Sequence, residues 1–533
     1  MPRSIAVALA AMALLPCAAP AQVATDGSVG ARASLAGPAY AIPDFLGRRV
    51  GANLLHSFST FNIRAGESAT FSGVRTIENI IARITGGLPS TIDGQLRVTA
   101  PDASLFLVNP AGLVFGPGAS VDVPGSFHAS TAHSLSLSDG TVIDMRTASP
   151  VTLTAAPPAA FGFDMPGAAI ALSGTQLRVR EGQRVSLVGG DITLDASAAG
   201  RAAALIAPSG AINLVATRGA GAVAIEGDRL APSGFAAMGD LAIRGGSAVL
   251  ANEGPARRGG GTVVMRGGDV TLDHAAVEAR TRFGNGRAID IGATGRLAID
   301  ASNVLAVTTG AGDAGSLRLE ARDIAVSGGS LVDTSCDPGC TTGAGGDLTL
   351  VAGDSISITG NDPLLPTFVV SNSFGGGRNG PISITAGGTF AMNGTALVQG
   401  IAIAGGEGST ITLDTGAIEM SGGAQVDAST RGAGRGGTIT VRNAGAMRLT
   451  GTRRDPLQGE ATLATGFFTS AAGAGAAGGI VISTASLEVL GGAEISSSAL
   501  RGSTGGGGTV AIAASGLLRV AGTDANGKSS GIV

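Results

Sequence analysis

Gly346-Asp347-Leu348-Thr349-Leu350 and, a few residues further on, Ile356-Ser357-Ile358 show the pattern that decides the fold of this 533-residue chain. In both runs aliphatic residues alternate with other residues, as expected for a β-strand with one buried and one exposed face. The glycine before the first run permits a tight corner from which the strand starts. The pattern therefore predicts a short strand, a corner and a second short strand.

The same unit recurs from about residue 185 onward. Its first aliphatic residues include Ile192, Ile212 and Leu241, and later Ile382, Ile411 and Ile439. These intervals are irregular but lie within the range of solenoid repeats. We therefore predict an all-β fold, a parallel β-helix with roughly 22 residues per coil and a length on the order of 100 Å. Other instances of the unit are residues 190–194, 210–214, 239–243, 261–265, 315–319, 437–441, 478–482 and 508–512.

The composition supports a thin stacked structure over a globular core. The chain has 88 glycines, 3% aromatic residues and no Trp, and Tyr40 is its only tyrosine. A β-propeller or sandwich, the alternative all-β fold, would need larger side chains in each repeat. Disorder, the other alternative, requires low hydrophobicity, whereas 44% of this chain is hydrophobic. Nine of the 16 Phe residues lie before residue 165, which predicts an N-terminal segment that caps the solenoid.

The first 21 residues have the features of a signal peptide. Arg3 supplies the positive charge, Ile5 to Leu15 form a short apolar stretch, and Ala19-Pro20-Ala21 provides a cleavage site. A lipoprotein acylated at Cys17 is the alternative, although Pro16 suits that signal poorly. No later segment is long and apolar enough to predict a transmembrane helix. The formal net charge is −4 with dispersed Arg residues, so no nucleic-acid partner is expected.

The remaining candidates for chemistry are few. Cys336 and Cys340 are expected to close a small structural disulfide, since the exported chain meets an oxidising compartment. The spacing of the four histidines predicts no metal site, and we expect no cofactor. Asp191 and Asp240 follow corner glycines and are able to align across coils, but such residues are more often solvated turn positions. A polysaccharide-cleaving β-helix enzyme is therefore the alternative function, and catalytic residues are not predicted.

Four segments near the N-terminus carry a resemblance to a known family. They are Asn53-Leu54-Leu55-His56-Ser57-Phe58-Ser59-Thr60-Phe61-Asn62-Ile63, Glu78-Asn79-Ile80-Ile81-Ala82-Arg83-Ile84-Thr85-Gly86-Gly87, Ser90-Thr91-Ile92-Asp93-Gly94 and Leu105-Phe106-Leu107-Val108-Asn109-Pro110-Ala111-Gly112-Leu113-Val114-Phe115-Gly116. In this order they resemble the haemagglutination-activity domain of filamentous-haemagglutinin-like exoproteins, which use two-partner secretion.

The resemblance implies a secretion signal, a fold and a partner. The N-terminal domain would be recognised by the periplasmic modules of a separate outer-membrane β-barrel transporter and would nucleate a right-handed β-helix. The residues predicted to take part in recognition are Asn62, Glu78, Asn79, Asn109, Pro110 and Gly112. The family usually has Asn-Pro-Asn-Gly, so Ala111 removes one side chain from that motif. The turn chemistry of Pro and Gly alone also explains a simple corner.

We therefore predict a secreted adhesin-like exoprotein of a Gram-negative bacterium, extracellular or at the cell surface, that is not an enzyme. Its ligand, a host-cell or glycan surface, is not specified by the sequence. An autotransporter with its own barrel is disfavoured, because no aromatic residue follows Phe468. The predicted segments are a signal peptide (1–21), the secretion domain (22–180), glycine-rich β-helix repeats (181–520) and a polar C-terminal tail (521–533).

Overall fold

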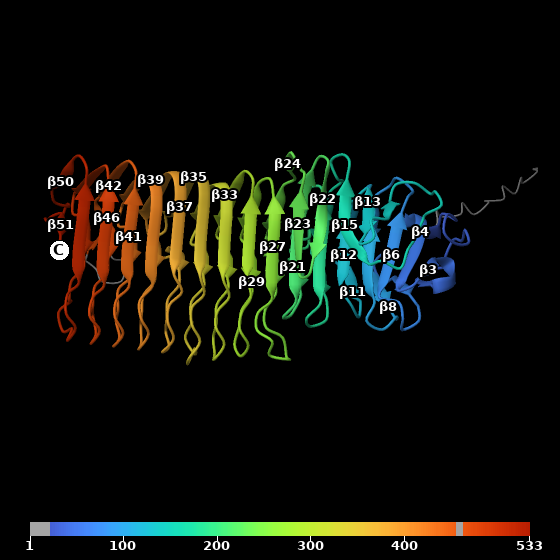
Figure 1. The fold of residues 1–533 in the computed structure, drawn as a ribbon, viewed down its shortest axis with the longest axis horizontal. Coiled ribbons are helices and arrows are strands. Elements are labelled where there is room, and N and C mark those ends of the chain that lie inside the picture. The colour runs from blue at the N-terminus through green and yellow to red at the C-terminus, as the bar shows by residue number, and fades with distance from the viewer. Residues whose placement is uncertain (1–21, 455–461) are drawn as a thin grey trace, which may run out of the picture.

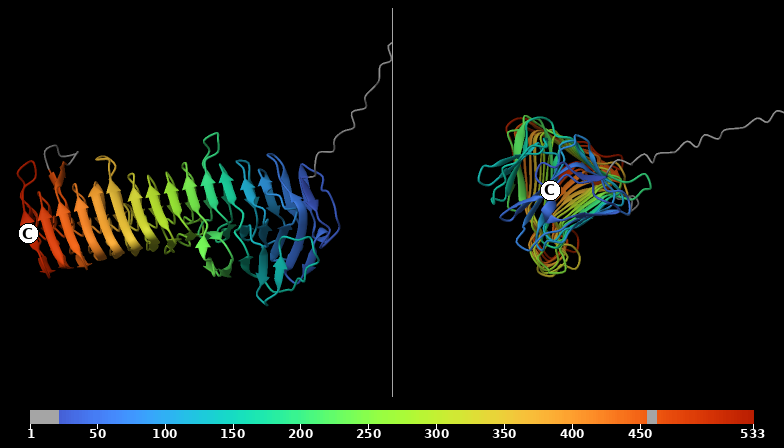
Figure 2. Two further views of the ribbon diagram at one scale, coloured as in Figure 1. Left: turned by 90° about the horizontal axis from the view of Figure 1, so that it is seen from above. Right: turned by 90° about the vertical axis from the view of Figure 1, so that its right-hand side faces the viewer.

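The structure, a computed structural model, describes residues 22–454 and 462–533. The predicted signal peptide with Cys17 therefore lies outside the described residues. Within them the chain winds into a parallel β-helix, which confirms the predicted fold class (Figure 1). Seen from its end, the solenoid has three sides (Figure 2), which we call faces one, two and three. The single described helix is a short 3-10 turn, η1 (Asp44–Leu46).

Face one forms the longest ladder, and its strands pair in parallel from coil to coil. They are β4 (Asn53–Phe61), β6 (Asn79–Ile84), β9 (Ser104–Val108), β12 (Phe127–Ser130), β18 (Arg184–Gly189), β21 (Ala211–Arg218), β27 (Thr262–Gly267), β30 (Ile289–Ala293), β33 (Leu317–Ser327), β35 (Leu348–Gly360), β37 (Ile382–Gly394), β39 (Thr410–Ser421), β41 (Thr438–Asn443), β46 (Gly479–Thr484) and β49 (Thr509–Ala514).

Face two follows face one in each coil, and β33, β35, β37 and β39 run through the corner to serve both faces. Its other strands are β7 (Ser90–Ile92), β10 (Leu113–Phe115), β16 (Ile170–Ser173), β19 (Ile192–Asp195), β25 (Leu241–Arg244), β28 (Val270–Asp273), β31 (Arg296–Asp300), β42 (Ala446–Thr450), β47 (Ser486–Leu490) and β50 (Leu518–Ala521).

Face three closes each coil with a short strand. It starts with the sheet β2 (Ala39–Ile42), β5 (Ser68–Phe71), β8 (Gln95–Val98) and β11 (Ser120–Asp122). It continues with β17 (Gln176–Arg178), β20 (Ala204–Ile206), β26 (Ala248–Leu250), β29 (Ala276–Glu278), β32 (Asn303–Leu305), β34 (Leu331–Asp333), β36 (Thr367–Val370), β38 (Ala396–Gln399), β40 (Gln425–Asp427), β45 (Gly466–Phe468), β48 (Glu494–Ser496) and β51 (Gly531–Ile532).

The alternating side chains make one continuous core inside the three faces. Ile382, Ile411 and Ile439 are register partners on face one, and each is at most 1% exposed. Burying such a side chain contributes about 1.5–3 kcal/mol. Because every coil adds its own row, the core grows along the axis and needs few aromatic residues.

Two details of the predicted repeat are wrong. Ile192 pairs with Leu241 on face two, whereas Ile212 belongs to face one, so the interval between Ile192 and Ile212 compares two different faces.

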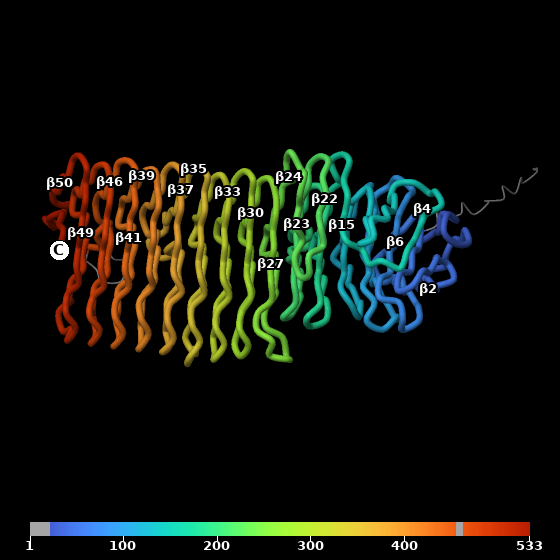
Figure 3. Tube along the Cα trace, viewed as in Figure 1, coloured from blue at the N-terminus to red at the C-terminus, as the bar shows by residue number. Residues whose placement is uncertain are grey.

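Most coils are also longer than the roughly 22 residues predicted for a solenoid unit, although Leu105 and Phe127 are register partners 22 residues apart. Thr415, Asn443 and Thr484 occupy equivalent positions on face one of successive coils, and they are 28 and 41 residues apart. The corners of the coils carry loops of unequal length (Figure 3). The fifteen described strands of face one, stacked at about 4.8 Å, span about 70 Å, which is shorter than the predicted rod of about 100 Å.

The N-terminal end of the solenoid is closed by antiparallel strands. β1 (Val23–Thr25) and β3 (Arg48–Val50) pair with the two halves of β4, so its outer edge is covered. Phe58, Phe61 and Phe71 fill the first coils with ring centroids 5.0–6.2 Å apart. We call residues 22–189 the cap and the coils that follow the repeat coils.

A second sheet packs on the outside of face one, with the strand order β14-β13-β15-β22-β23. Between it and face one lies a separate apolar core that includes Leu55, Phe106 and Phe161. The strands of this sheet are β13 (Ser134–Leu137), β14 (Val142–Asp144), β15 (Pro158–Phe163), β22 (Gly221–Glu226) and β23 (Arg229–Ser233). Its last two strands lie well beyond residue 180, so the structural unit extends past the predicted domain boundary. The short strand β24 (Ala237–Met238) then returns to β21, and a hairpin of β43 (Thr452–Arg454) and β44 (Thr462–Ala464) projects later.

The C-terminal segment predicted as a polar tail continues the solenoid instead. β50 pairs with β47 on face two, and β51 pairs with β48 on face three. Between them, Asp524 accepts the backbone N–H groups of Asn526 and Lys528. The predicted tail is wrong because the prediction rested on polar composition. A stacked corner is held by hydrogen bonds and does not require apolar side chains.

Candidate functional site

The turn Asn109–Gly112 lies at the corner between faces one and two, after β9. Asn109 is completely buried. Its Nδ2 donates to the carbonyl oxygen of Leu88 at 2.9 Å and to Ser90 Oγ at 3.0 Å, and its Oδ1 accepts the backbone N–H two residues on at 2.9 Å. Gly112 has a φ of +125°, in the region that favours glycine. These residues fix the shape of the turn, and the Asn109 side chain is not available to a partner.

Asn62 lies at the same corner, in the coil on the N-terminal side of the turn that contains Leu88. Its Oδ1 accepts the backbone N–H of Thr91 at 2.8 Å. The turn between β6 and β7 is thus held from both sides, by Asn62 below and by Asn109 above. Leu88 at its tip is 75% exposed. Pro110, in the turn of the next coil, is half-buried.

Glu78 and Asn79 lie at the opposite end of face one, where β6 begins, roughly 15 Å from the turn by strand rise. Asn79 Nδ2 donates to Asn53 Oδ1 at 3.0 Å, and Asn53 Nδ2 donates to the carbonyl oxygens of Thr154 and Ala156. The Glu78 side chain is exposed. The structure therefore gathers Asn62 and the Asn109–Gly112 turn at one corner and leaves Glu78 and Asn79 apart.

A buried polar centre, not predicted from the sequence, ties the cap together. The guanidinium of Arg83, which is fully buried, donates to Ser57 Oγ at 2.8 Å and to Ser28 Oγ at 2.7 Å. Both hydroxyls donate in turn to the carboxylate of Asp26, each at 2.6 Å. Arg83 also donates to the carbonyl oxygen of Asp144 in the outer sheet at 2.9 Å. One hydrogen-bond network thus joins the segment that follows β1, face one and the outer sheet.

The network sets the protonation of its two charged groups. Burial alone would raise the pKa of Asp26, but hydrogen bonds from Ser28, Ser57 and Thr85 outweigh it and lower the pKa. Burial lowers the pKa of Arg83, and the charges of Asp26 and Asp144 oppose this shift. The only clue in the sequence is a charged residue inside the apolar strand Asn79–Ile84.

Two histidines of the cap are buried, and burial has the largest effect on the pKa of each. Burial lowers the pKa of His56 to about 4, against a small opposing effect of Asp44. Burial, and then the charge of Arg184, lower the pKa of His128 to about 3. Neither ring nitrogen of His56 has a hydrogen-bond partner among the described residues. Both rings are therefore neutral in the folded cap at neutral pH.

In the repeat coils the corner between faces one and two carries aspartates in register. Asp191 Oδ1 accepts the backbone N–H of Asp240 at 2.9 Å, and Asp240 Oδ1 accepts that of Asp269 at 3.1 Å. Arg218 pairs with Asp191 at 2.9 Å and with Asp240 at 3.4 Å. Asp191 and Asp240 thus align, and their hydrogen bonds join one coil to the next. We call this row the aspartate ladder.

Cys336 and Cys340 form a disulfide bond, with Cα atoms 5.6 Å apart. Cys336 lies in a row of corner residues in which Thr308, Cys336 and Ser373 are register partners. Thr308 Oγ1 donates to the carbonyl oxygen of Gly312 at 2.6 Å, and Ser373 Oγ to that of Gly377 at 2.8 Å. Each bond closes a loop to the fourth residue on, so the disulfide takes the place of that hydrogen bond in its own coil.

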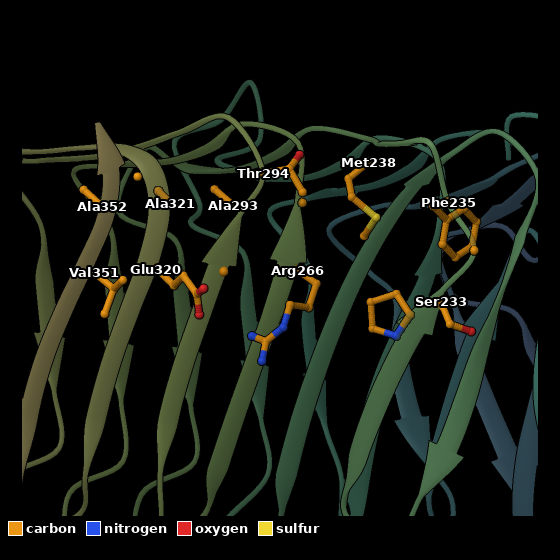
Figure 4. Close-up of a pocket in the computed structure, with 15 residues that line it drawn as sticks. Ser233, Phe235, Met238, Arg266, Ala293, Thr294, Glu320, Ala321, Val351 and Ala352 are labelled. Atoms are coloured by element: carbon orange, nitrogen blue, oxygen red, sulfur yellow. The ribbon is translucent and has the colours of Figure 1, made fainter. Parts of the chain in front are cut away.

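A groove of about 630 Å³ crosses face one where the outer sheet ends. Gly292 lies in register between Arg266 and Glu320 and leaves space between their side chains. Figure 4 shows these two side chains along the groove, with Phe235 at one end and Val351 at the other. Arg266 pairs with Asp290 at 2.7 Å and Glu320 with Arg318 at 2.8 Å. The floor consists of Gly and Ala residues, so the groove is apolar with one charge of each sign.

Within residues 22–454 and 462–533, no group of His, Cys, Asp and Glu side chains is arranged to hold a metal ion. Nor do these residues include a helix of the length and apolar character needed to cross a membrane.

The closed cap, its outer sheet and the long stacked solenoid define a capped parallel β-helix protein. Residues 21–272 match the family model described as the TPS secretion domain, where TPS stands for two-partner secretion. The matched segment is slightly less than half of the chain, and it is similar to the secretion domain of two-partner secretion exoproteins. The match extends beyond residue 180 to include β22 and β23, in agreement with the outer sheet.

Two solved structures are similar to this chain. One is the HMW1 secretion domain from Haemophilus influenzae, with 13% identity, a TM-score of 0.36, and coverage of 90% of this chain and 96% of that one. The other is the filamentous hemagglutinin secretion domain, with 14% identity, a TM-score of 0.24, and coverage of 77% and 97%. No curated protein matches the chain.

Proposed function

We propose that this chain is an adhesin-like exoprotein of two-partner secretion: a separate outer-membrane β-barrel exports it by recognising the cap, and the repeat coils then bind a host-cell or glycan surface. The observation that carries the first part is the match of residues 21–272 to the secretion domain. The cap is closed at its N-terminal edge and held by the Arg83 network, so it provides a defined template on which later coils stack.

The groove supports binding rather than turnover. Its volume is typical of ligand sites, and its length follows the solenoid axis across β27, β30, β33 and β35. Arg266 and Glu320 are each neutralised by a neighbouring charge. Paired charges suit hydrogen bonding to an uncharged ligand, whereas proton transfer requires a group with a shifted pKa close to the reacting atom.

Export is tested in the native host with and without the candidate transporter. Accumulation of the mature chain in the periplasm when the transporter is deleted supports the proposal, and unchanged extracellular protein contradicts it.

Binding is tested with the purified full chain on a glycan array and on host cells. Gly292→Leu fills the space between Arg266 and Glu320 and is expected to weaken binding roughly tenfold or more. Ser483→Leu, at the same register position far along face one, is the matched control. Release of reducing ends from a polysaccharide would favour the alternative, a secreted β-helix enzyme.

A further inference from the structure

The corner between faces one and two carries an exposed apolar surface in the cap. We call it the corner patch, and it consists of Leu88, Pro89, Pro110, Ala111, Val114 and Ala168. Leu88 is 75% exposed and Val114 is 40% exposed. A Cβ atom placed on Gly112 would lie 3.6 Å from Pro89 Cβ and 3.7 Å from Ala168 Cβ. Turns from three successive coils therefore form one continuous surface.

No charge interrupts this surface. Residues 84–92, 103–121 and 165–177, which include the three turns and the face-two strands β7, β10 and β16 that follow them, contain no Asp, Glu, Lys, Arg or His. The next position along the same corner is Asp191, where the aspartate ladder and Arg218 begin. The patch thus ends where the first repeat coils place charged side chains at this corner.

The patch is also held rigidly. Leu88 is placed by the hydrogen bond from Asn109 Nδ2 to its carbonyl oxygen, while Ser90 N–H donates to the carbonyl oxygen of Gly112 at 3.1 Å. An exposed leucine on a fixed turn loses little conformational freedom when it is bound. Exposed apolar surface of this kind is typical of protein interaction sites, and the hydrogen bonds of the turn do not require it.

We propose that the corner patch is the surface by which the cap docks on the periplasmic module of its transporter, with Leu88 as the anchor in an apolar pocket of that module. The inference rests on the proposed function. A transporter that reads this domain needs a surface on the cap, and the corner patch offers a rigid apolar one. The patch lies inside the matched region.

The first experiment measures export in the native host. Leu88→Glu is expected to reduce extracellular protein roughly tenfold, because a buried charge in a docking pocket is strongly unfavourable. Phe45→Glu is the matched control, since Phe45 is also 75% exposed in the cap but lies in η1, near the other end of β4. Thermal unfolding of both purified variants should equal that of the parent chain.

The second experiment reads the contact directly and does not depend on a charge substitution. A photo-crosslinking amino acid at position 88 is expected to capture the transporter's periplasmic module in the host, and the same group at position 45 is not.

Normal export of Leu88→Glu, equal loss of export in both variants, or no crosslink from position 88 would each overturn the inference. Dimers of the parent chain in light scattering that Leu88→Glu dissociates, with export unchanged, would assign the patch to self-association instead. Export that does not need the transporter would overturn the proposed function itself, so the two failures are distinguishable.

Discussion

The corner between faces one and two stacks from coil to coil in both regions of the molecule, but with different side chains. In the repeat coils Asp191 and Asp240 accept backbone N–H groups from the following coil. In the cap the same position is occupied by turns without charge, and Leu88 is exposed to solvent. Since the aspartate ladder shows that polar side chains suffice to stack a corner, stability does not account for the apolar patch. This difference supports the proposed role of the cap corner in docking.

The buried ionisable groups differ in the same way. The cap encloses a cation, Arg83, together with the neutral rings of His56 and His128. In the repeat coils the buried ionisable groups are carboxyl groups whose pKa is raised, unlike that of Asp26 in the cap. Burial and the charge of Asp337 raise the pKa of Asp333 to about 7, and burial also raises the pKa of Asp427. The two regions should therefore respond differently to mutation and to acid.

The largest difference is expected from removing the buried cation. Arg83→Met leaves Asp26 buried without its counter-charge and should destabilise the cap by about 3–5 kcal/mol. Arg218→Met in the repeat coils is the control, because that side chain is half-exposed and its pairs are screened by solvent. Hydrogen exchange of β4 and β6 in urea measures the effect locally, since a solenoid of this length does not unfold in one step. Equal protection of β4 in both variants would contradict the comparison.

Acid should separate the two regions. The folded-state pKa of His56 is about 4, below the unfolded value of about 6.5. The full free energy of unfolding is therefore available above pH 6.5, where His56 is neutral in both states. As the pH falls towards 4, His56 is protonated in the unfolded chain first, and the free energy of unfolding falls by about 3 kcal/mol. The raised pKa of Asp333 acts in the opposite direction: its contribution is present below pH 4 and is lost as the pH rises to about 7.

Between pH 7 and pH 4.5 the cap should therefore lose protection from hydrogen exchange while β34 gains it, after correction for intrinsic rates. His56→Leu should remove most of the loss in β4. Parallel changes in cap and repeat coils would show that the whole solenoid titrates as a unit.

The disulfide should be replaceable by the hydrogen bond used in neighbouring coils. Cys336→Ala with Cys340→Ala removes a short closed loop, at a cost of about 2 kcal/mol. Cys336→Thr with Cys340→Gly reproduces the arrangement of Thr308 and Gly312 and should recover about 1 kcal/mol of that loss. Local exchange around β34 distinguishes the two. Identical hydrogen-exchange protection in the two double variants would mean that a threonine at position 336 does not form the hydrogen bond that Thr308 forms in its own coil.

The smallest effect is expected from the aspartate ladder. Asp240→Ala removes one acceptor for the backbone N–H of Asp269 and should cost about 0.5 kcal/mol, because the site is exposed to solvent. High salt should shrink the effect by screening Arg218. A loss as large as that of Arg83→Met would contradict the distinction between the two regions.

The fold could be predicted from the sequence because the decisive signal is local. Alternation in a run such as Leu348-Thr349-Leu350 marks a strand whatever the rest of the chain does. The assignment of runs to faces is not local, and for that reason the pattern alone puts Ile192 and Ile212 in one series although they belong to different faces.

The site could be predicted only in part. The Asn109–Gly112 turn is recognisable from Pro and Gly, but its burial depends on the coils above and below it. Leu88 stands in an ordinary Gly-Gly-Leu-Pro turn, and its exposure next to Pro110 arises only from stacking. Arg83 has partners 26 to 66 residues away in the sequence, which no local pattern indicates.

The unequal coil lengths have an evolutionary consequence. Between β39 and β46 the coil spacing changes from 28 to 41 residues, measured at the hydrogen-bonded row of Thr415, Asn443 and Thr484. Ile411, Ile439 and Ile480 nevertheless remain register partners. One extra residue within a strand would turn its core side chains outward, whereas an insertion at a corner enters solvent and leaves the ladder intact. Chains of this architecture should therefore diverge in length by gaining and losing corner loops or whole coils, with insertions and deletions excluded from the strands.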